Sequence, residues 1–142
     1  MILPDLNLLM YAYNRSMPKH ERARSWWEGC LNGKETIGLP WAVALGFVRL
    51  TTNRRVLDRP WTVDEALDVV ESWRDHPLVI LLDPGPTHLP QLRKLLRQAG
   101  VAGPLTTDAH LAALAIEHGC RLYTNDADFG RFAGLVRRNP LR

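Results

Sequence analysis

The sequence predicts a single α/β domain in which a central, mostly parallel sheet lies between two layers of helices, a three-layer α/β/α sandwich. Short apolar runs alternate along the chain with segments whose apolar residues recur at helical spacing. One run, Leu78 to Leu82, contains only branched aliphatic residues, which is typical of strands that helices cover on both faces. The 142 residues fit one domain, spanning residues 1–142, and no linker or repeat divides them.

Each expected element follows from this alternation of patterns. In chain order we expect a strand at 1–4, helices at 6–13 and 18–31, a strand at 36–39, helices at 40–50 and 62–73, a strand at 78–82, helices at 89–99 and 108–118, a strand at 120–124 and an edge strand at 135–136. The segment 40–50 is apolar nearly all round, with Arg49 as its only charge, which indicates a helix buried on several sides or lying in a subunit interface.

Cap and turn residues mark the helix ends. Thr62 and Glu65 have the spacing of a capping box at a helix start. The hydroxyls of Thr106 and Thr107 stand before Asp108, where they predict a capped helix. Gly119 ends that helix, as a residue that tolerates positive φ does.

Acidic residues stand at three of these element ends. Asp5 directly follows the first strand, Asp108 opens a helix, and Asp126 and Asp128 follow the strand at 120–124. Parallel α/β sheets bind ligands beyond the carboxyl ends of their strands, where the strand order reverses. We therefore expect Asp5, Asp108 and Asp126 to meet there.

Carboxylates packed together repel one another unless a cation compensates their charge. Mg²⁺ and Mn²⁺ prefer oxygen ligands, so the sequence favours a site for one of these ions. Taken singly, Asp108 is better explained as a first-turn acid that the helix dipole stabilises, and Asp126 and Asp128 as turn residues; only their joint occurrence favours the metal site. Asp5 is harder to explain in that way, because an acid after a buried strand is desolvated unless something pairs with it.

The composition indicates the cellular environment of the protein and the kind of partner that it could bind. Cys30 and Cys120 lie far apart without a pairing motif, which favours a reducing, cytoplasmic environment. No apolar run is long enough to span a membrane. The formal net charge of +3 includes the pairs Arg54-Arg55 and Arg137-Arg138, which suit either an ordinary solvated surface or a polyanionic partner such as nucleic acid.

The ordered set of acids resembles the sequence pattern of PIN domains. The resemblance rests on Asp5 with Asn7 at the first strand, on TTDAHLAALAIEHG with Asp108, and on TNDADF with Asp126 and Asp128, and it covers the whole chain. Within that family, the size and single-domain layout are similar to VapC-type toxins of bacterial toxin–antitoxin pairs. The resemblance implies a Mg²⁺- or Mn²⁺-dependent endoribonuclease that is usually dimeric and is held inactive by a cognate VapB-type antitoxin.

The resemblance also implies roles for single residues. Asp5, Asp108 and Asp126 would hold the ion, and Asp128 would bind a second ion or orient the attacking water. Asn7, Thr107 and Thr124 would support these carboxylates, the two threonines through hydrogen bonds. Arg49 would either contact a phosphate or pair with one of the acids. An antitoxin segment would lay an apolar helix over residues 41–50 and insert a basic side chain among the acids.

One position departs from the family pattern. Where the family usually carries a glutamate in a pattern resembling Glu-Phe-x-Arg, this chain reads Gly46-Phe47-Val48-Arg49. Glycine cannot ligate a metal ion, so a second interpretation is a catalytically weak module that binds RNA or antitoxin without cutting. Gly46 could alternatively serve close helix packing. A third interpretation is a phosphatase of the haloacid dehalogenase type, which Asp5-Leu6-Asn7 resembles faintly.

Overall fold

Five short strands form one sheet in which every neighbouring pair is parallel. The computed structural model describes residues 1–142. The strand order is β3-β2-β1-β4-β5. The strands are β1 (Ile2–Pro4), β2 (Ile37–Pro40), β3 (Val79–Leu82), β4 (Arg121–Tyr123) and β5 (Arg137–Arg138).

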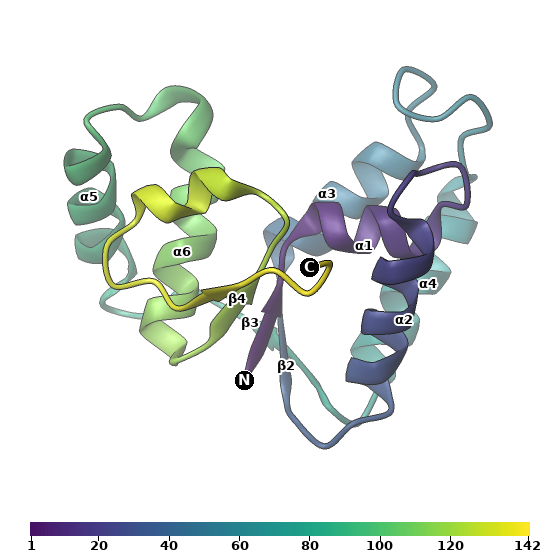
Figure 1. Cartoon of the computed structure of the whole chain (residues 1–142), viewed down its shortest axis with the longest axis horizontal. Helices are drawn as coiled ribbons and strands as arrows, with labels where there is room; N and C mark the ends of the chain where they lie inside the picture. The colour runs from purple at the N-terminus through teal and green to yellow at the C-terminus, as the bar shows by residue number, and fades with distance from the viewer.

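Helices cover both faces of this sheet, which confirms the predicted three-layer sandwich (Figure 1). One layer holds α1 (Leu6–Tyr13), α2 (His20–Leu31), α3 (Trp41–Thr51) and α4 (Val63–Asp75). The other holds α5 (His88–Ala99) and α6 (Thr106–His118). Two short 3₁₀ helices, η1 (Gly103–Leu105) and η2 (Ala127–Arg131), flank α6 and β4. No helix is both long enough and apolar enough to cross a bilayer.

The order of the strands reverses between β1 and β4. From β1 the chain adds β2 and β3 on one side of the sheet, then returns to place β4 and β5 on the other. Residues that directly follow β1 and β4 therefore lie next to each other, at the switch point where open α/β sheets bind ligands.

Aromatic side chains join the helices of the larger layer. The Tyr13 hydroxyl accepts hydrogen bonds from Nε1 of Trp73 at 2.9 Å and from Nε1 of Trp27 at 3.2 Å. Phe47 packs edge-on against Tyr13 and Trp73. Both tryptophans are buried, so satisfying their N–H groups removes a desolvation cost inside the core. Trp26 is only partly buried and stacks on Tyr123 of β4.

Three details differ from the sequence predictions. The last strand lies at Arg137–Arg138 rather than at 135–136. β3 forms one edge of the sheet and leaves Ile80 49% exposed, so its aliphatic composition does not reflect burial on both faces. No threonine hydroxyl caps α6, because η1 leads directly into the helix and the backbone before it is already helical. The capping box of Thr62 and Glu65 and the positive φ of Gly119 are confirmed.

Candidate active site

A pocket of about 130 Å³ opens at the carboxyl edge of the sheet, at the switch point between β1 and β4. Its lining contains three carboxylates from separate parts of the chain, together with residues of α1, α3 and α6. The lining residues are Asp5, Leu6, Asn7, Ala42, Val43, Arg49, Thr107, Asp108, Leu111 and Asp126.

Asp5 is the most deeply buried of the three acids, at 6% exposure. It connects β1 to α1, and its backbone N–H donates to the carbonyl of Tyr123 in β4 at 2.9 Å. The Thr124 hydroxyl donates to its Oδ2 at 2.8 Å. Burial raises the pKa of Asp5 to about 6, with smaller upward contributions from Asp108 and Asp126, although the Thr124 hydrogen bond opposes the change.

Asp108 reaches the pocket from the opposite helical layer. Because α6 leads into the amino end of β4, the start of the helix lies at the carboxyl edge of the sheet, and Asp108 stands in its first turn. Burial raises the pKa of Asp108, and the negative charges of Asp126 and Asp128 raise it further. The charges of these acids are therefore coupled across the pocket.

Asp126 is held by the turn that follows β4. Its backbone N–H donates to the Thr124 hydroxyl at 2.9 Å, and its Oδ1 accepts from the N–H of Asp128 at 2.8 Å. Thr124 therefore contacts both strand-end acids. Asp128 is exposed and does not line the pocket, although its charge acts on Asp108.

The other predicted site residues differ in their contacts. Arg49 and Asn7 line the pocket, and both are exposed. Arg49 forms no ion pair, so its guanidinium is available to a ligand. Thr107 also lines the pocket, but its hydroxyl forms no hydrogen bond to a carboxylate.

Apolar residues of α1 and α3 complete the pocket wall, and the polar patterns in the sequence did not identify them. A Cβ at Gly46 would lie 2.6 Å from Cδ2 of Leu6, so Leu6 occupies the space that a side chain at position 46 would need. The glycine that stands in place of the family glutamate therefore leaves room for Leu6 where α1 packs against α3. The only signals available in the sequence were the apolar character of residues 40–50 and the glycine itself.

The donor set suits a hard divalent cation. Carboxylate oxygens are the ligands that Mg²⁺ and Mn²⁺ favour, and three carboxylates lining one pocket require a compensating charge to be ionised together. In the structure, no three acidic, histidine or cysteine side chains already converge on one point that could hold an ion. Since Asp5 and Asp126 each use one oxygen in a hydrogen bond, each retains a second oxygen for a ligand.

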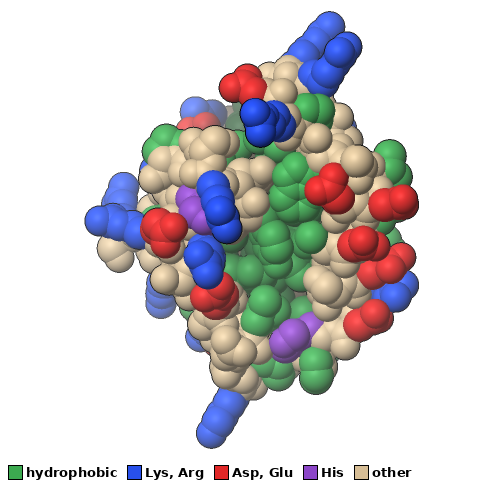
Figure 2. All heavy atoms as spheres, turned by 90° about the vertical axis from the view of Figure 1, so that its right-hand side faces the viewer, with side chains coloured by type: hydrophobic (Ala, Val, Ile, Leu, Met, Phe, Trp, Pro, Cys, Tyr) green, Lys and Arg blue, Asp and Glu red, His purple; other side chains and the backbone are tan.

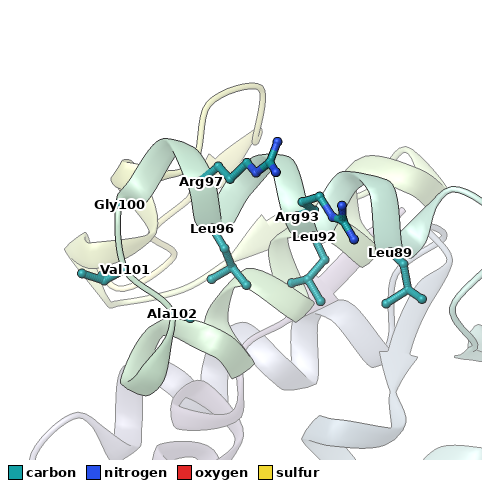
Figure 3. A pocket seen from close by; sticks show the side chains of 8 residues that line it. All are labelled: Leu89, Leu92, Arg93, Leu96, Arg97, Gly100, Val101 and Ala102. Carbon is teal, nitrogen blue, oxygen red and sulfur yellow. The ribbon is translucent and has the colours of Figure 1, made fainter.

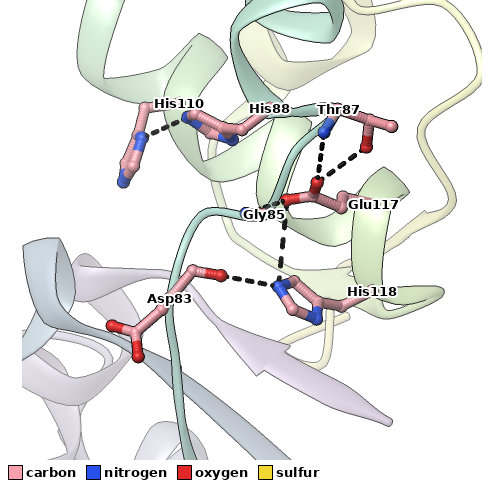
Figure 4. A network of polar contacts seen from close by, with 7 residues as sticks. All are labelled: Asp83, Gly85, Thr87, His88, His110, Glu117 and His118. Carbon is pink, nitrogen blue, oxygen red and sulfur yellow. Dashed lines mark hydrogen bonds and ion pairs between the residues drawn. The ribbon is translucent and has the colours of Figure 1, made fainter.

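A separate polar network fixes α6 to the segment before α5 (Figure 4). Glu117 accepts hydrogen bonds from the N–H groups of Gly85 and Thr87 and from the Thr87 hydroxyl, at 2.8, 3.0 and 2.6 Å. His88 Nε2 lies 2.9 Å from His110 Nδ1. The histidine spacing in the sequence did not reveal this pair, because its partners lie on two different helices. The network holds the helix that carries Asp108.

Comparisons with known proteins place the chain in a family. Residues 2–135 match the model of the PIN domain. Ribonuclease VapC33 of Mycobacterium tuberculosis is 44% identical over 142 residues, which cover 100% of this chain and 99% of the relative. Ribonuclease VapC37 of the same organism is 37% identical, covering 99% and 97%.

Solved structures agree on the fold. M. tuberculosis VapC20, a sarcin-ricin loop cleaving toxin, superposes with a TM-score of 0.71 at 18% identity, covering 96% of this chain and 97% of that chain. VapBC2 from Rickettsia felis, bound to a DNA fragment from its promoter, gives a TM-score of 0.68 at 19% identity, covering 98% of each chain. Because the sequence relatives match along the full length, this chain belongs to the PIN domain family, among the VapC ribonucleases.

Proposed function

We propose that this protein is the toxin of a toxin–antitoxin pair, an endoribonuclease that uses Mg²⁺ or Mn²⁺ held by Asp5, Asp108 and Asp126. The observation that carries the proposal is the meeting of these three carboxylates, from three distant parts of the chain, in one pocket at the switch point of the sheet. The reaction is hydrolysis of an RNA phosphodiester bond.

Each residue has a task set by its contacts. Held by these carboxylates, a divalent ion would supply Lewis-acid chemistry, polarising a phosphoryl oxygen and lowering the pKa of a bound water. Asp5, Asp108 and Asp126 supply oxygen ligands. Thr124 orients the Asp5 carboxylate through its hydroxyl and fixes the backbone of Asp126 by accepting from its N–H. Arg49, exposed and free of acid partners, binds a phosphate of the substrate through its fork of donors. Asp128 acts through its charge or orients the water.

Cleavage of single-stranded RNA by the purified protein tests the proposal. We expect cutting with Mg²⁺ or Mn²⁺ and none with EDTA. Cutting that persists in EDTA would contradict the metal requirement. A small phosphomonoester assayed in parallel distinguishes a phosphatase, because a PIN nuclease should leave it intact.

An antitoxin is the proposed protein partner. Trp41 and Leu45 of α3 are 46% and 61% exposed, so an apolar segment has a surface to cover there. On the side of the molecule that carries α2 and α4, apolar side chains gather in a hollow with acidic side chains along the α4 rim (Figure 2). The exposed acids of α4 are Asp64, Glu65, Asp68, Glu71 and Asp75. A partner with apolar and basic side chains suits this face.

Co-expression with the protein encoded beside it tests the partner. We expect the two chains to purify together and the nuclease activity to fall in the complex. Separate purification with unchanged activity would refute this part of the proposal. A homodimer is also proposed, because closed two-fold pairs are the commonest oligomers, and measurement of the molar mass in solution tests it.

A binding module without catalysis is the second candidate. It is favoured by Gly46, because Leu6 fills the position where the family glutamate would stand and α3 contributes no carboxylate to the pocket. RNA binding by well-folded protein with no cleavage in either metal would support this candidate over the nuclease.

A further inference from the structure

A groove of about 810 Å³ lies between two loops on the side of the molecule that carries α1 and α3. One loop, residues 14–19, connects α1 to α2, and the other, residues 52–62, connects α3 to α4. Both rise at the same end of the molecule in Figure 1. We call this the loop groove; its lining is Asn14, Arg15, Ser16, Met17, Pro18, Val56, Leu57, Asp58 and Arg59.

The two loops that form the loop groove are strongly basic, and Arg15 and Arg59 line the groove itself. The two loops carry five cationic side chains and one acid, Asp58. All five cations are exposed, and none forms an ion pair with an acid: Arg15, Lys19, Arg54, Arg55 and Arg59. Lys and Arg side chains project from the upper end of the molecule in Figure 2, the end at which both loops rise in Figure 1. Uncompensated cations around a hollow create a field that attracts a polyanion.

Both loops are fixed by internal contacts. The Asn53 carbonyl accepts from the N–H groups of Val56 and Leu57, and its side chain accepts from the N–H of Arg55. Leu57 is buried. On the other loop, the buried Asn14 donates to the Met10 carbonyl at 2.7 Å. The backbone of each loop is therefore ordered before binding, which lowers the entropy cost of presenting the cations to a ligand.

The loop groove is one helix length away from the acids. Asp5 precedes α1 and Asn14 follows it, so the rise of the helix separates them by about 13 Å. Arg49 of the pocket stands only four residues before Asn53 on the other side. A single strand that enters the pocket can reach the groove within the ~4–16 nucleotides that one single-strand-binding domain typically covers.

From this placement we propose that the loop groove is a second binding site, which holds the phosphate backbone of an RNA substrate away from the bond that is cut. The inference rests on the proposed nuclease function and extends it. RNA is favoured over an acidic protein because unpaired, exposed cations surround the groove, whereas the centres of protein interfaces are depleted of charge.

The experiment compares two variants that each lose two exposed arginines. Arg15→Gln with Arg59→Gln alters the loop groove. Arg93→Gln with Arg97→Gln is the control, on the outer side of α5, where both arginines border an apolar pocket of about 590 Å³ in the opposite helical layer (Figure 3). Binding of fluorescent single-stranded RNA is measured in EDTA across a range of salt concentrations, so that cleavage cannot contribute. Circular dichroism checks that both variants fold.

We expect the loop variant to bind RNA more weakly than the wild type. The logarithm of the binding constant should also fall less steeply with the logarithm of the salt concentration. Each lost phosphate contact reduces this slope by about 0.7, so two lost contacts reduce it by about 1.4. The control should retain the wild-type slope. Equal slopes in all three proteins, or equal losses in both variants, would overturn the inference. Unchanged RNA binding with weaker antitoxin binding would also overturn it and assign the groove to the protein partner.

Binding in EDTA separates this inference from the nuclease proposal. A protein that binds RNA through the loop groove and never cuts it would support the groove and contradict the nuclease. In a cleaving protein, the loop variant should raise KM for long RNA with little change in kcat, because the lost contacts lie away from the reacting bond.

Discussion

Asp5 is held in the fold where its charged form is disfavoured. Its pKa is about 6 in the folded protein, against 3.8 for an unperturbed aspartate. Between these values the folded state keeps a proton that the unfolded chain releases, so the free energy of unfolding falls as the pH rises through this window. The penalty reaches about 3 kcal/mol at pH 7, at roughly 1.4 kcal/mol per pKa unit. A bound cation would remove it.

Asp5→Asn should therefore stabilise the protein while abolishing RNA cleavage. In EDTA at pH 7, we expect urea unfolding to show a gain of up to about 3 kcal/mol over the wild type, because the amide avoids the cost of a buried charge. The gain should vanish below about pH 4, where wild-type Asp5 is protonated in both states. A variant equally stable or less stable than the wild type at pH 7 would contradict the burial argument.

Thr124 should control the pH dependence of cleavage. Its hydroxyl donates to Asp5 and lowers the pKa of that carboxyl. Thr124→Val removes the donor, so the pKa of Asp5 rises and the acid limb of the rate profile shifts to higher pH. Thr124→Ser retains the hydroxyl and should keep the wild-type limb. An unchanged limb in the valine variant would show that Asp5 does not govern it.

At the scale of elements, the contact between α1 and α3 shapes the pocket. Leu6 of α1 lies where a side chain at position 46 of α3 would project. The two positions are forty residues apart in the sequence, and no local pattern connects them. The glycine was visible as a departure from the family pattern, but the residue that fills its space became identifiable only from the packing of the helices.

Gly46→Glu should change the free energy of unfolding by about 1 kcal/mol or less, because the atom it meets is the flexible end of the half-buried Leu6 side chain and replacing a mid-helix glycine offsets the cost of moving it. The double variant Leu6→Ala with Gly46→Glu should lose less stability than the sum of the two single changes. Chemical denaturation of the four proteins in this cycle measures the coupling. Strict additivity would mean that Leu6 does not occupy the space needed at position 46.

The elements themselves were largely predictable, for reasons that particular residues illustrate. Thr62 with Glu65 and the glycine at position 119 act through local backbone chemistry, so sequence spacing identified both. The cap of α6 was wrongly predicted because η1 continues into the helix and leaves no extended cap residue. The exposure of Ile80 was missed because β3 has the same composition as an internal strand but lies at the sheet edge.

At the scale of the whole molecule, the parallel sheet explains why acids distant in the sequence meet. Asp5 and Asp126 follow neighbouring strands, and Asp108 stands in the first turn of a helix that begins at the same edge and runs away from it toward the start of β4. This meeting was predictable, because topology alone determines which strand ends are adjacent. The exact lining was not, since the exclusion of Asp128 from the pocket depends on the turn made by η2.

A divalent ion should stabilise the whole fold if it binds between these elements. At a free concentration 100 times its dissociation constant, an ion that binds only the folded state adds about 2.7 kcal/mol to the free energy of unfolding. In a domain of this size, each kcal/mol raises the Tm by about 2–4 °C. We expect Mn²⁺ to raise the Tm of the wild type and to leave Asp108→Asn nearly unchanged. Identical shifts in both proteins would place the ion elsewhere.

We propose that Asp5, Asp108 and Asp126 form one metal-dependent nuclease site. The most direct test measures RNA cleavage with Mn²⁺ by the wild type, by Asp5→Asn and Asp108→Asn, and by Asp83→Asn as a control. Asp83 is an exposed aspartate that follows β3 at the same edge of the sheet but outside the pocket. We predict cleavage by the wild type and the control alone. Cleavage by either pocket variant at the wild-type rate would show that these acids do not form the nuclease site.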